Sequence, residues 1–220
     1  MFKKPIKVIL WDFDGTIYHS EDSYREYAKC IESVMKNSDS FANKSMQVVK
    51  DKENKVGDDG WAIIANLANG SVSREEMDMC FARTREKMNE GKIKINLQST
   101  AVKILKKQEI RHILLTNTPE KYVIPLLENF GIKNLFYRIV CSAKKPDSFK
   151  NVMNDLLTRE NIRSEDILSI GDNYKNDIIP SMEMGFKTVF IQNYQRDSKA
   201  DLTVNQLEDA IPFIENFVKN

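Results

Sequence analysis

The chain has 220 residues, of which 41% are hydrophobic and 30% are charged, so it is long enough for one large domain or two small ones. These fractions exclude a disordered, a collagen-like or a membrane-spanning chain. The 33 basic and 32 acidic residues leave a formal net charge of +1, so no global field favours nucleic acid or an anionic membrane, and an anionic ligand needs a local site.

The cysteines and the N-terminus both bear on the cellular compartment. Cys30, Cys80 and Cys141 are odd in number, far apart and without metal-ligand spacing, so we expect three reduced thiols in a cytoplasmic protein. Lys7 and Asp12 interrupt the first apolar stretch too early for a signal peptide. We therefore expect no targeting segment and no transmembrane helix.

Short apolar runs alternate with helical patterns over most of the chain. The runs suit strands that are buried on both faces, as in a parallel sheet, and they cover residues 7–11, 111–116, 136–141, 166–170 and 187–192. Helices are predicted over 99–108, from the Thr118-Pro119 pair to Gly131, and over 148–157 and 205–218. This alternation predicts the α/β class, with a doubly wound parallel sheet.

Residues 18–95 interrupt the alternation with helical signals alone, so they are predicted to form an α-helical insertion into a core made of 1–17 and 96–220. Within the insertion, Ser73 to Glu76 has the spacing of a capping box before a long amphipathic stretch. The sequence Gly57-Asp58-Asp59-Gly60 predicts a loop between two of its helices, because Gly and Asp are turn formers.

Polar side chains follow four of the predicted strands. They comprise Asp12, Asp14 and Gly15 after the first, Thr116 and Asn117 after the second, Lys144 and Lys145 after the third, and Gly171, Asp172 and Asp177 after the fourth. Because the carboxyl ends of parallel strands form the ligand crevice of such sheets, we expect these side chains to converge. Several carboxylates brought together repel one another unless a cation lies among them, which favours Mg²⁺ and a phosphorylated ligand.

The segments DFDGT, Thr116, Lys145-Pro146 and GDNYKND occur in an order that resembles the four motifs of the haloacid dehalogenase (HAD) superfamily of phosphohydrolases. The resemblance covers residues 6 to about 192, and the helical insertion lies where this family has its C1 cap. It implies a Rossmann-like core, and DFDGT followed by Ile-Tyr is similar to the phosphoglycolate phosphatases and pyrimidine nucleotidases of the family.

The resemblance also implies roles for the protein side chains. Asp12 would be the nucleophile that becomes an aspartyl-phosphate, and Asp14 would be the general acid and base. Thr116 and the Asn117 backbone would hold phosphoryl oxygens, and Lys145 would screen the charge between nucleophile and phosphoryl group.

For the metal, the resemblance implies Mg²⁺ held by the Asp12 carboxylate, the Asp14 backbone carbonyl and Asp172, with Asp177 in support. The family lysine usually precedes a proline, which selects Lys145, but the sequence leaves its neighbour Lys144 open. Pro180 follows Asp177 closely, so the helix after the fourth motif should start late or kink.

Two histidines and one loop lie outside the four motifs. His19 is interpreted as a solvated linker residue and His112 as a structural strand residue. The loop of the insertion is a possible specificity loop over the active site, comprising Gly57, Asp58, Asp59, Gly60 and Trp61, with Trp61 as an apolar wall.

The sequence therefore predicts an Mg²⁺-dependent phosphatase that hydrolyses a small soluble phosphomonoester and binds neither nucleic acid nor membrane. The presence of Asp14 argues against a dehalogenase, which needs no leaving-group acid. A phosphomutase would share the core motifs, and a non-catalytic module could keep the fold, so both stay open. A phospho-receiver module is rejected, because its acidic pattern follows different strands.

Overall fold

The computed structural model describes residues 5–36 and 40–218. These residues form two compact units. The core unit comprises the described residues up to Tyr18, then Leu97–Gln192, and the described residues from Arg196 onward; the cap unit comprises His19–Asn96 and Asn193–Gln195. Among the described helices, none is long and apolar enough to cross a membrane.

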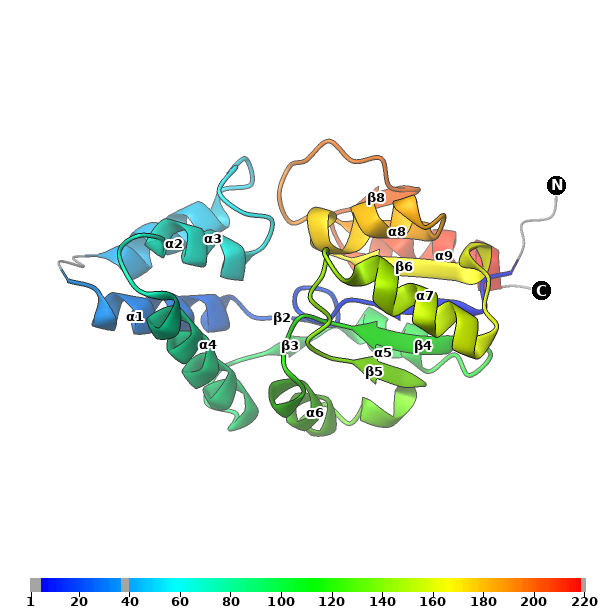
Figure 1. Cartoon of the computed structure of the whole chain (residues 1–220), viewed down its shortest axis with the longest axis horizontal. Coiled ribbons are helices and arrows are strands. Elements are labelled where there is room, and N and C mark those ends of the chain that lie inside the picture. Colours follow the sequence, from blue (N-terminus) through cyan, green and yellow to red (C-terminus); the bar gives the residue numbers. More distant parts are fainter. Residues whose placement is uncertain (1–4, 37–39, 219–220) are drawn as a thin grey trace. The chain divides into compact units, whose positions relative to one another are not determined.

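The core unit contains a six-stranded parallel sheet in the order β5-β4-β1-β6-β7-β8 (Figure 1). Its strands are β1 (Val8–Trp11), β4 (Arg111–Leu115), β5 (Arg138–Val140), β6 (Ile167–Gly171), β7 (Lys187–Ile191) and β8 (Leu202–Val204). From β1 the chain adds β4 and β5 on one side and then returns to add β6, β7 and β8 on the other. The predicted doubly wound sheet is confirmed, and its direction reverses beside β1, where such folds bind ligands.

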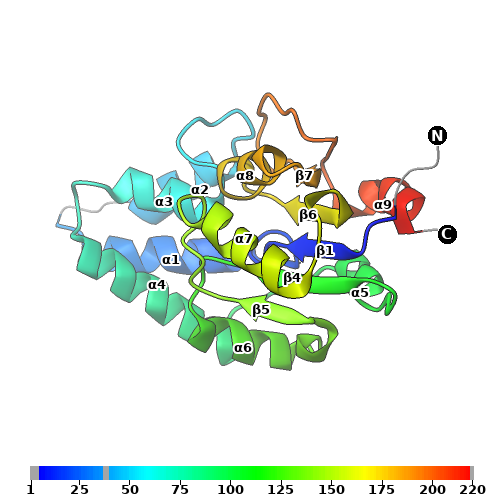
Figure 2. The same ribbon diagram turned by 45° about the vertical axis from the view of Figure 1, so that its right-hand side comes forward.

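Helices connect the strands and cover the sheet, as the predicted alternation requires. They are α5 (Ser99–Leu105), α6 (Glu120–Asn129), α7 (Phe149–Glu160), α8 (Ile179–Glu183) and α9 (Ile211–Val218). In Figure 2, α7 crosses the sheet, and its buried Phe149, Met153 and Leu156 pack against one face of the central strands. That face is apolar because alternate strand residues, such as Val8 and Leu10, point to it.

Several element boundaries differ from the sequence-based expectation. The predicted helix over 205–218 is a 3₁₀ turn (Leu207–Ala210) followed by α9, and the short strand β8 was not predicted. Pro180 lies in the first turn of α8, which follows a π-helical turn at Tyr174–Ile178, so the expected late start of this helix is confirmed.

The described residues of the cap unit form the helices α1 (Glu21–Val34), α2 (Phe41–Lys50), α3 (Gly60–Ala68) and α4 (Arg74–Asn89). Ser73 and Glu76 form the predicted capping box at the start of α4. Cys30 on α1 and the buried Cys80 on α4 form a disulfide. The expectation of three reduced thiols is therefore wrong for this pair, because the packing of α1 against α4 brings together cysteines 50 residues apart, while Cys141 is free.

A segment that follows β7 completes the cap unit. Tyr194 is buried in the apolar cluster of the cap helices, and its hydroxyl donates a hydrogen bond to the Val49 carbonyl at 3.0 Å. The Gln195 amide donates to the Lys52 carbonyl at 2.7 Å, and Lys52 Nζ donates to the Asn193 carbonyl at 2.9 Å. The residues Asn193–Gln195, hereafter the 193–195 segment, thus belong structurally to a unit that is distant in the sequence.

The chain also passes between the units at both ends of the long insertion. There β2 (Tyr18–His19) and β3 (Asn96–Leu97) pair in a two-stranded sheet. His19 is exposed and lies edge-on to the Tyr24 ring at 6.3 Å between centroids. This exposure agrees with its interpretation as a linker residue.

Candidate active site

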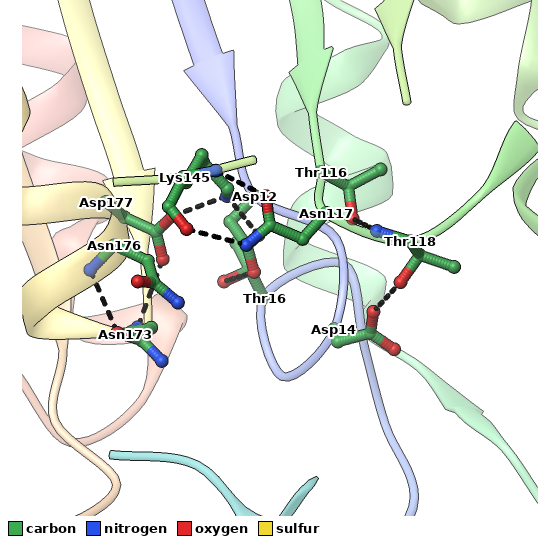
Figure 3. A network of polar contacts seen from close by, with 10 residues as sticks. All are labelled: Asp12, Asp14, Thr16, Thr116, Asn117, Thr118, Lys145, Asn173, Asn176 and Asp177. Atoms are coloured by element: carbon green, nitrogen blue, oxygen red, sulfur yellow. Dashed lines mark hydrogen bonds and ion pairs between the residues drawn. The ribbon is translucent and has the colours of Figure 1, made fainter. Parts of the chain in front are cut away.

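Residues from four strand ends meet at the carboxyl edge of the core sheet (Figure 3). Asp12 directly follows β1, Thr116 follows β4, Lys145 lies in the loop after β5, and Asp172 follows β6. This convergence is what the parallel sheet predicts, since all four strands end at the same edge.

Lys145 is the buried cation of the site. Its Nζ lies 2.7 Å from Asp12 Oδ1 and 2.5 Å from Asp177 Oδ1, and its side chain is only 3% exposed. Burial acts to lower the pKa of Lys145, but the charges of Asp12 and Asp177 outweigh it and hold the pKa above its ordinary value. The neighbouring Lys144 is exposed, so the geometry selects Lys145 between the two lysines that the sequence left open.

The carboxylates of Asp12, Asp172 and Asp177 form an acidic cluster, in which one oxygen of each lies within 4.8 Å of the others. Burial raises the pKa of Asp177 to about 7, and the Asp12 charge adds to this rise, although Lys145 opposes it. Burial likewise raises the pKa of Asp12 against the opposing effect of Lys145. One lysine therefore does not fully compensate the cluster.

The charges and ligand atoms of this cluster indicate whether a metal ion would fit there. Two buried carboxylates and one half-buried carboxylate, with one lysine, have a deficit of positive charge, and carboxylate oxygens are the ligands that hard divalent cations prefer. The donor set suits such a cation. The Asp14 carboxylate is not one of these three, and a role for the Asp14 backbone carbonyl as a ligand stays a prediction.

Two glycines allow the acidic side chains to approach the backbone. Gly15 has a φ of +81°, and a Cβ built there would overlap the Asp172 carboxylate. A Cβ at Gly171 would lie 2.6 Å from the Cβ of Asp177. Both glycines are therefore required by close packing, and Gly15 also by its left-handed backbone conformation.

The two residues after β4, Thr116 and Asn117, use their side chains in different ways. The Asn117 side-chain amide donates to the Lys145 carbonyl at 3.0 Å, and its side-chain oxygen accepts from the Lys145 amide at 2.6 Å. The Asn117 side chain therefore holds the Lys145 loop, and binding of a phosphoryl oxygen by the Asn117 backbone stays a prediction. Thr116 Oγ1 accepts a hydrogen bond from the Thr118 amide at 3.1 Å, so its own hydrogen can be donated to a ligand.

Asp14 has two hydroxyl partners that the sequence reasoning did not identify. Thr118 Oγ1 donates to Asp14 Oδ2 at 2.9 Å, and the Tyr18 hydroxyl donates to Asp14 Oδ1. Thr16, in the same turn, has its hydroxyl 3.4 Å from Asp12 Oδ2. The one available signal was position, since Thr118 lies two residues after Thr116 and Tyr18 four residues after Asp14.

His112 has a structural role in the core unit. Its Nδ1 accepts a hydrogen bond from Trp11 Nε1 at 3.1 Å, and its Nε2 lies 3.4 Å from the Lys107 carbonyl. Burial lowers its pKa to about 4, so it is neutral near pH 7. Its ring supports β1 from the neighbouring strand, as the sequence predicted.

The predicted specificity loop is anchored within the cap unit, but Gly60 and Trp61 are the first residues of α3 and are not part of a loop. Asn54 Oδ1 accepts hydrogen bonds from the amides of Val56 and Gly57, and Asp59 caps α3 by accepting from the Ala62 amide at 2.8 Å. Trp61 lies among aromatic rings of α1 and α4, and the Arg85 guanidinium is 4.5 Å from its ring centroid. A role for Gly57, Asp58, Asp59, Gly60 and Trp61 in substrate selection stays a prediction.

Comparison with known proteins finds a matching family model and relatives that are named phosphoglycolate phosphatases. A family model described as "Haloacid dehalogenase-like hydrolase" matches residues 9–191. A phosphoglycolate phosphatase of Vibrio cholerae is 27% identical over 199 residues, which cover 83% of this chain and 82% of that protein. Phosphoglycolate phosphatase 1 of Pseudomonas aeruginosa is 22% identical over 224 residues, which cover 94% of this chain and 79% of that protein.

Solved structures share the fold at low sequence identity. A predicted phosphoglycolate phosphatase from Haemophilus somnus superimposes with a TM-score of 0.65 at 20% identity, covering 94% of this chain and 97% of that one. The HAD hydrolase YfnB from Bacillus subtilis, which was solved bound to magnesium, superimposes with a TM-score of 0.68 at 18% identity. The superposition covers 96% of this chain and 100% of that one.

Proposed function

The chain belongs to the haloacid dehalogenase-like hydrolases, and from this premise we propose that it is an Mg²⁺-dependent phosphatase that hydrolyses a small phosphomonoester through an aspartyl-phosphate. The observation that carries the proposal is the contact of Asp12 with the buried Lys145, beside the carboxylates of Asp172 and Asp177 and at the edge of the sheet that also holds Thr116. A nucleophilic carboxylate needs such compensation to approach an anionic phosphoryl group.

In the first half-reaction, an oxygen of Asp12 attacks phosphorus while the bond to the leaving oxygen breaks. Lys145 Nζ donates to Asp12 Oδ1 and keeps the nucleophile ionised and oriented, against the effect of burial. Thr116 donates its hydroxyl hydrogen to a phosphoryl oxygen, and the Asn117 backbone amide binds another. Asp14, in its protonated form, gives its proton to the leaving oxygen.

In the second half-reaction, Asp14 accepts a proton from water as the water oxygen bonds to phosphorus. The bond between phosphorus and the Asp12 oxygen breaks, which restores the carboxylate and releases inorganic phosphate. Asp14 thereby regains the proton that it lost, so the cycle closes without another acid or base.

The metal would be held by the Asp12 and Asp172 carboxylates and the Asp14 backbone carbonyl, with Asp177 in support. Mg²⁺ bound there would supply positive charge that stabilises the phosphoryl group in the transition state. The three clustered carboxylates, whose charge one lysine compensates only in part, support this assignment. The magnesium bound to the YfnB structure is consistent with it.

For the substrate, we propose a small soluble phosphomonoester, and phosphoglycolate is the first compound to test because the relatives in Vibrio and Pseudomonas carry that name. We also propose that residues 18–95 act as a cap, with the 57–61 loop selecting the leaving group. On this proposal, small esters should be hydrolysed faster than a folded phosphoprotein, and equal rates would contradict the role of the cap.

The direct test is phosphate release from phosphoglycolate, sugar phosphates, nucleoside monophosphates and an activated aryl phosphate, with Mg²⁺ or EDTA. Wild type should release phosphate only with Mg²⁺, and Asp12→Asn should release none, because the amide is isosteric but not nucleophilic. Asp147→Asn, at an exposed carboxylate in the loop after β5, is the matched control and should keep full activity. Turnover by Asp12→Asn at the wild-type rate would refute the proposal.

A further inference from the structure

The Asp14 carboxylate is held at both of its oxygens by side-chain hydroxyls of the core unit. Oδ1 accepts from Tyr18, and Oδ2 accepts from Thr118 at 2.9 Å, a contact drawn in Figure 3. A free aspartate rotates about two side-chain torsions, whereas a carboxylate with a donor at each oxygen is fixed in position and plane. The two donors come from segments 100 residues apart in the sequence, so the arrangement is a product of the fold.

The Tyr18 hydroxyl is itself rigidly placed. The residue is 2% exposed, and its ring packs against Phe13 at 5.0 Å and Phe130 at 5.9 Å between centroids. The backbone of the same turn is closed by a hydrogen bond from the Gly15 amide to the Tyr18 carbonyl at 2.9 Å. The hydroxyl therefore reaches Asp14 from a ring that has little freedom to move.

Thr118 is equally fixed, and it connects Asp14 to the phosphate-binding threonine. The residue is 5% exposed, its amide donates to Thr116 Oγ1 at 3.1 Å, and its carbonyl accepts from the Ser142 amide at 3.2 Å. A displacement of Thr118 would therefore disturb both Thr116 and Asp14. The backbone amide of Thr118 thus contacts Thr116, and its side chain contacts Asp14.

We propose that Tyr18 and Thr118 are positioning residues that orient the Asp14 carboxyl group for proton transfer; this proposal rests on the phosphatase function proposed above. Each carboxylate oxygen has two lone pairs, so a hydroxyl hydrogen bond to an oxygen does not by itself prevent protonation of the carboxyl group. The two hydroxyls can thus hold Asp14 both when it carries the proton to the leaving oxygen and when it takes the proton from water. The net transfer is unchanged, and the hydroxyls keep their own protons.

The test compares esters that need the acid with esters that do not. Thr118→Val is nearly isosteric but removes the hydroxyl, Thr118→Ser keeps it, and Tyr18→Phe keeps the ring that packs in the core. In single-turnover assays with enzyme in saturating excess over substrate, Thr118→Val and Tyr18→Phe should each slow cleavage of an alkyl phosphate by about 10- to 100-fold, the scale expected for a misplaced catalytic group. Cleavage of an activated aryl phosphate and KM should change little, and Thr118→Ser should recover most of the alkyl rate.

Asp14→Asn supplies the second readout. In that background, Thr118→Val should add no further loss on the alkyl phosphate, because the group that it positions no longer transfers a proton. A merely structural role would instead slow both esters equally and would add to the loss in Asp14→Asn. Either of these results, or an unchanged alkyl rate in both hydroxyl deletions, would overturn the proposal.

The assays separate failure of this proposal from failure of the proposed function. If wild type hydrolyses both esters with Mg²⁺, Asp12→Asn does not, and Asp14→Asn discriminates between the esters, the phosphatase mechanism stands while Thr118→Val and Tyr18→Phe decide the positioning role. If folded wild type hydrolyses neither ester, the proposed function fails and the positioning role fails with it. Circular dichroism and thermal unfolding of each variant confirm that the compared proteins are folded.

Discussion

Replacement of Gly15 by alanine would test how closely the first motif is fitted around the acidic cluster. Two effects add at this position. The φ of +81° is in the left-handed region, where an alanine costs about 1 to 2 kcal/mol. The new Cβ would also lie 2.6 Å from Asp172 Cγ, and such overpacking typically costs about 1 to 3 kcal/mol more.

Gly185→Ala is the matched control, because it lies in the same unit and shares only the first effect. Its φ is +77°, and a Cβ there would meet no atom within 4 Å. We expect Gly15→Ala to lower the free energy of unfolding by about 2 to 5 kcal/mol and Gly185→Ala by about 1 to 2 kcal/mol. Urea unfolding in EDTA measures both values.

The same pair of variants tests whether Asp172 is a metal ligand. Since Asp172 must move to admit the Cβ at residue 15, Gly15→Ala should weaken Mg²⁺ binding in isothermal titration calorimetry, whereas Gly185→Ala should not. Equal losses of stability and equal Mg²⁺ affinities in the two variants would refute the reasoning, because backbone conformation alone would then explain both.

The buried lysine, the disulfide and the acidic cluster each give a further measurable outcome. In EDTA, Lys145→Met should lower the free energy of unfolding by about 3 to 5 kcal/mol, because buried carboxylates lose their cation, and the exposed Lys144→Met by less than about 0.5 kcal/mol; equal losses would contradict this. Reduction of the Cys30–Cys80 disulfide should destabilise the cap unit by up to about 4 kcal/mol in chemical unfolding, and a variant with serine at both positions should not respond to the reductant. The folded pKa of Asp177 is about 7, above its ordinary 3.8, so the native state holds this proton more tightly and metal-free stability should fall as pH rises from about 4 to about 7; Asp177→Asn should remove this component, and an unchanged pH profile would disprove it.

Most of the sheet could be predicted because β1, β4, β6 and β7 are largely buried on both faces and read as continuous apolar runs. The exception is β8 (Leu202–Val204), a three-residue strand at the edge of the sheet with an exposed Thr203, which has no run long enough to recognise. The order of the strands could not be derived from the runs themselves. It depends on which strands pair, and pairing is a property of the folded chain.

The motif residues could be placed together because each follows a strand, but their hydrogen-bond partners could not. The Asn117 side chain holds the backbone of Lys145 across a 28-residue separation, a contact that nothing in the sequence indicates. Likewise, nothing in the sequence indicates that Thr118 reaches Asp14. Such contacts depend on side-chain directions at the sheet edge, which spacing along the chain does not determine.

The cysteine pair shows the same limit. Because the cysteines are odd in number and widely spaced, the sequence favoured free thiols. In the structure, α1 and α4 pack side by side and bring Cys30 to Cys80. A pairing across 50 residues needs knowledge of which cap helices are neighbours. The capping box at Ser73, in contrast, was predictable because both of its partners lie within one turn.

The 193–195 segment makes the cap unit discontinuous in the gene. A chimaera that exchanges only residues 19–96 between relatives would install a foreign set of helices around the native Tyr194, which is 6% exposed and bonded to Val49. Transplanting the cap therefore means transplanting two pieces of coding sequence. For the same reason, a substitution in the 193–195 segment should require a compensating substitution in the Val49–Lys52 region when the cap unit is recombined or evolved in the laboratory.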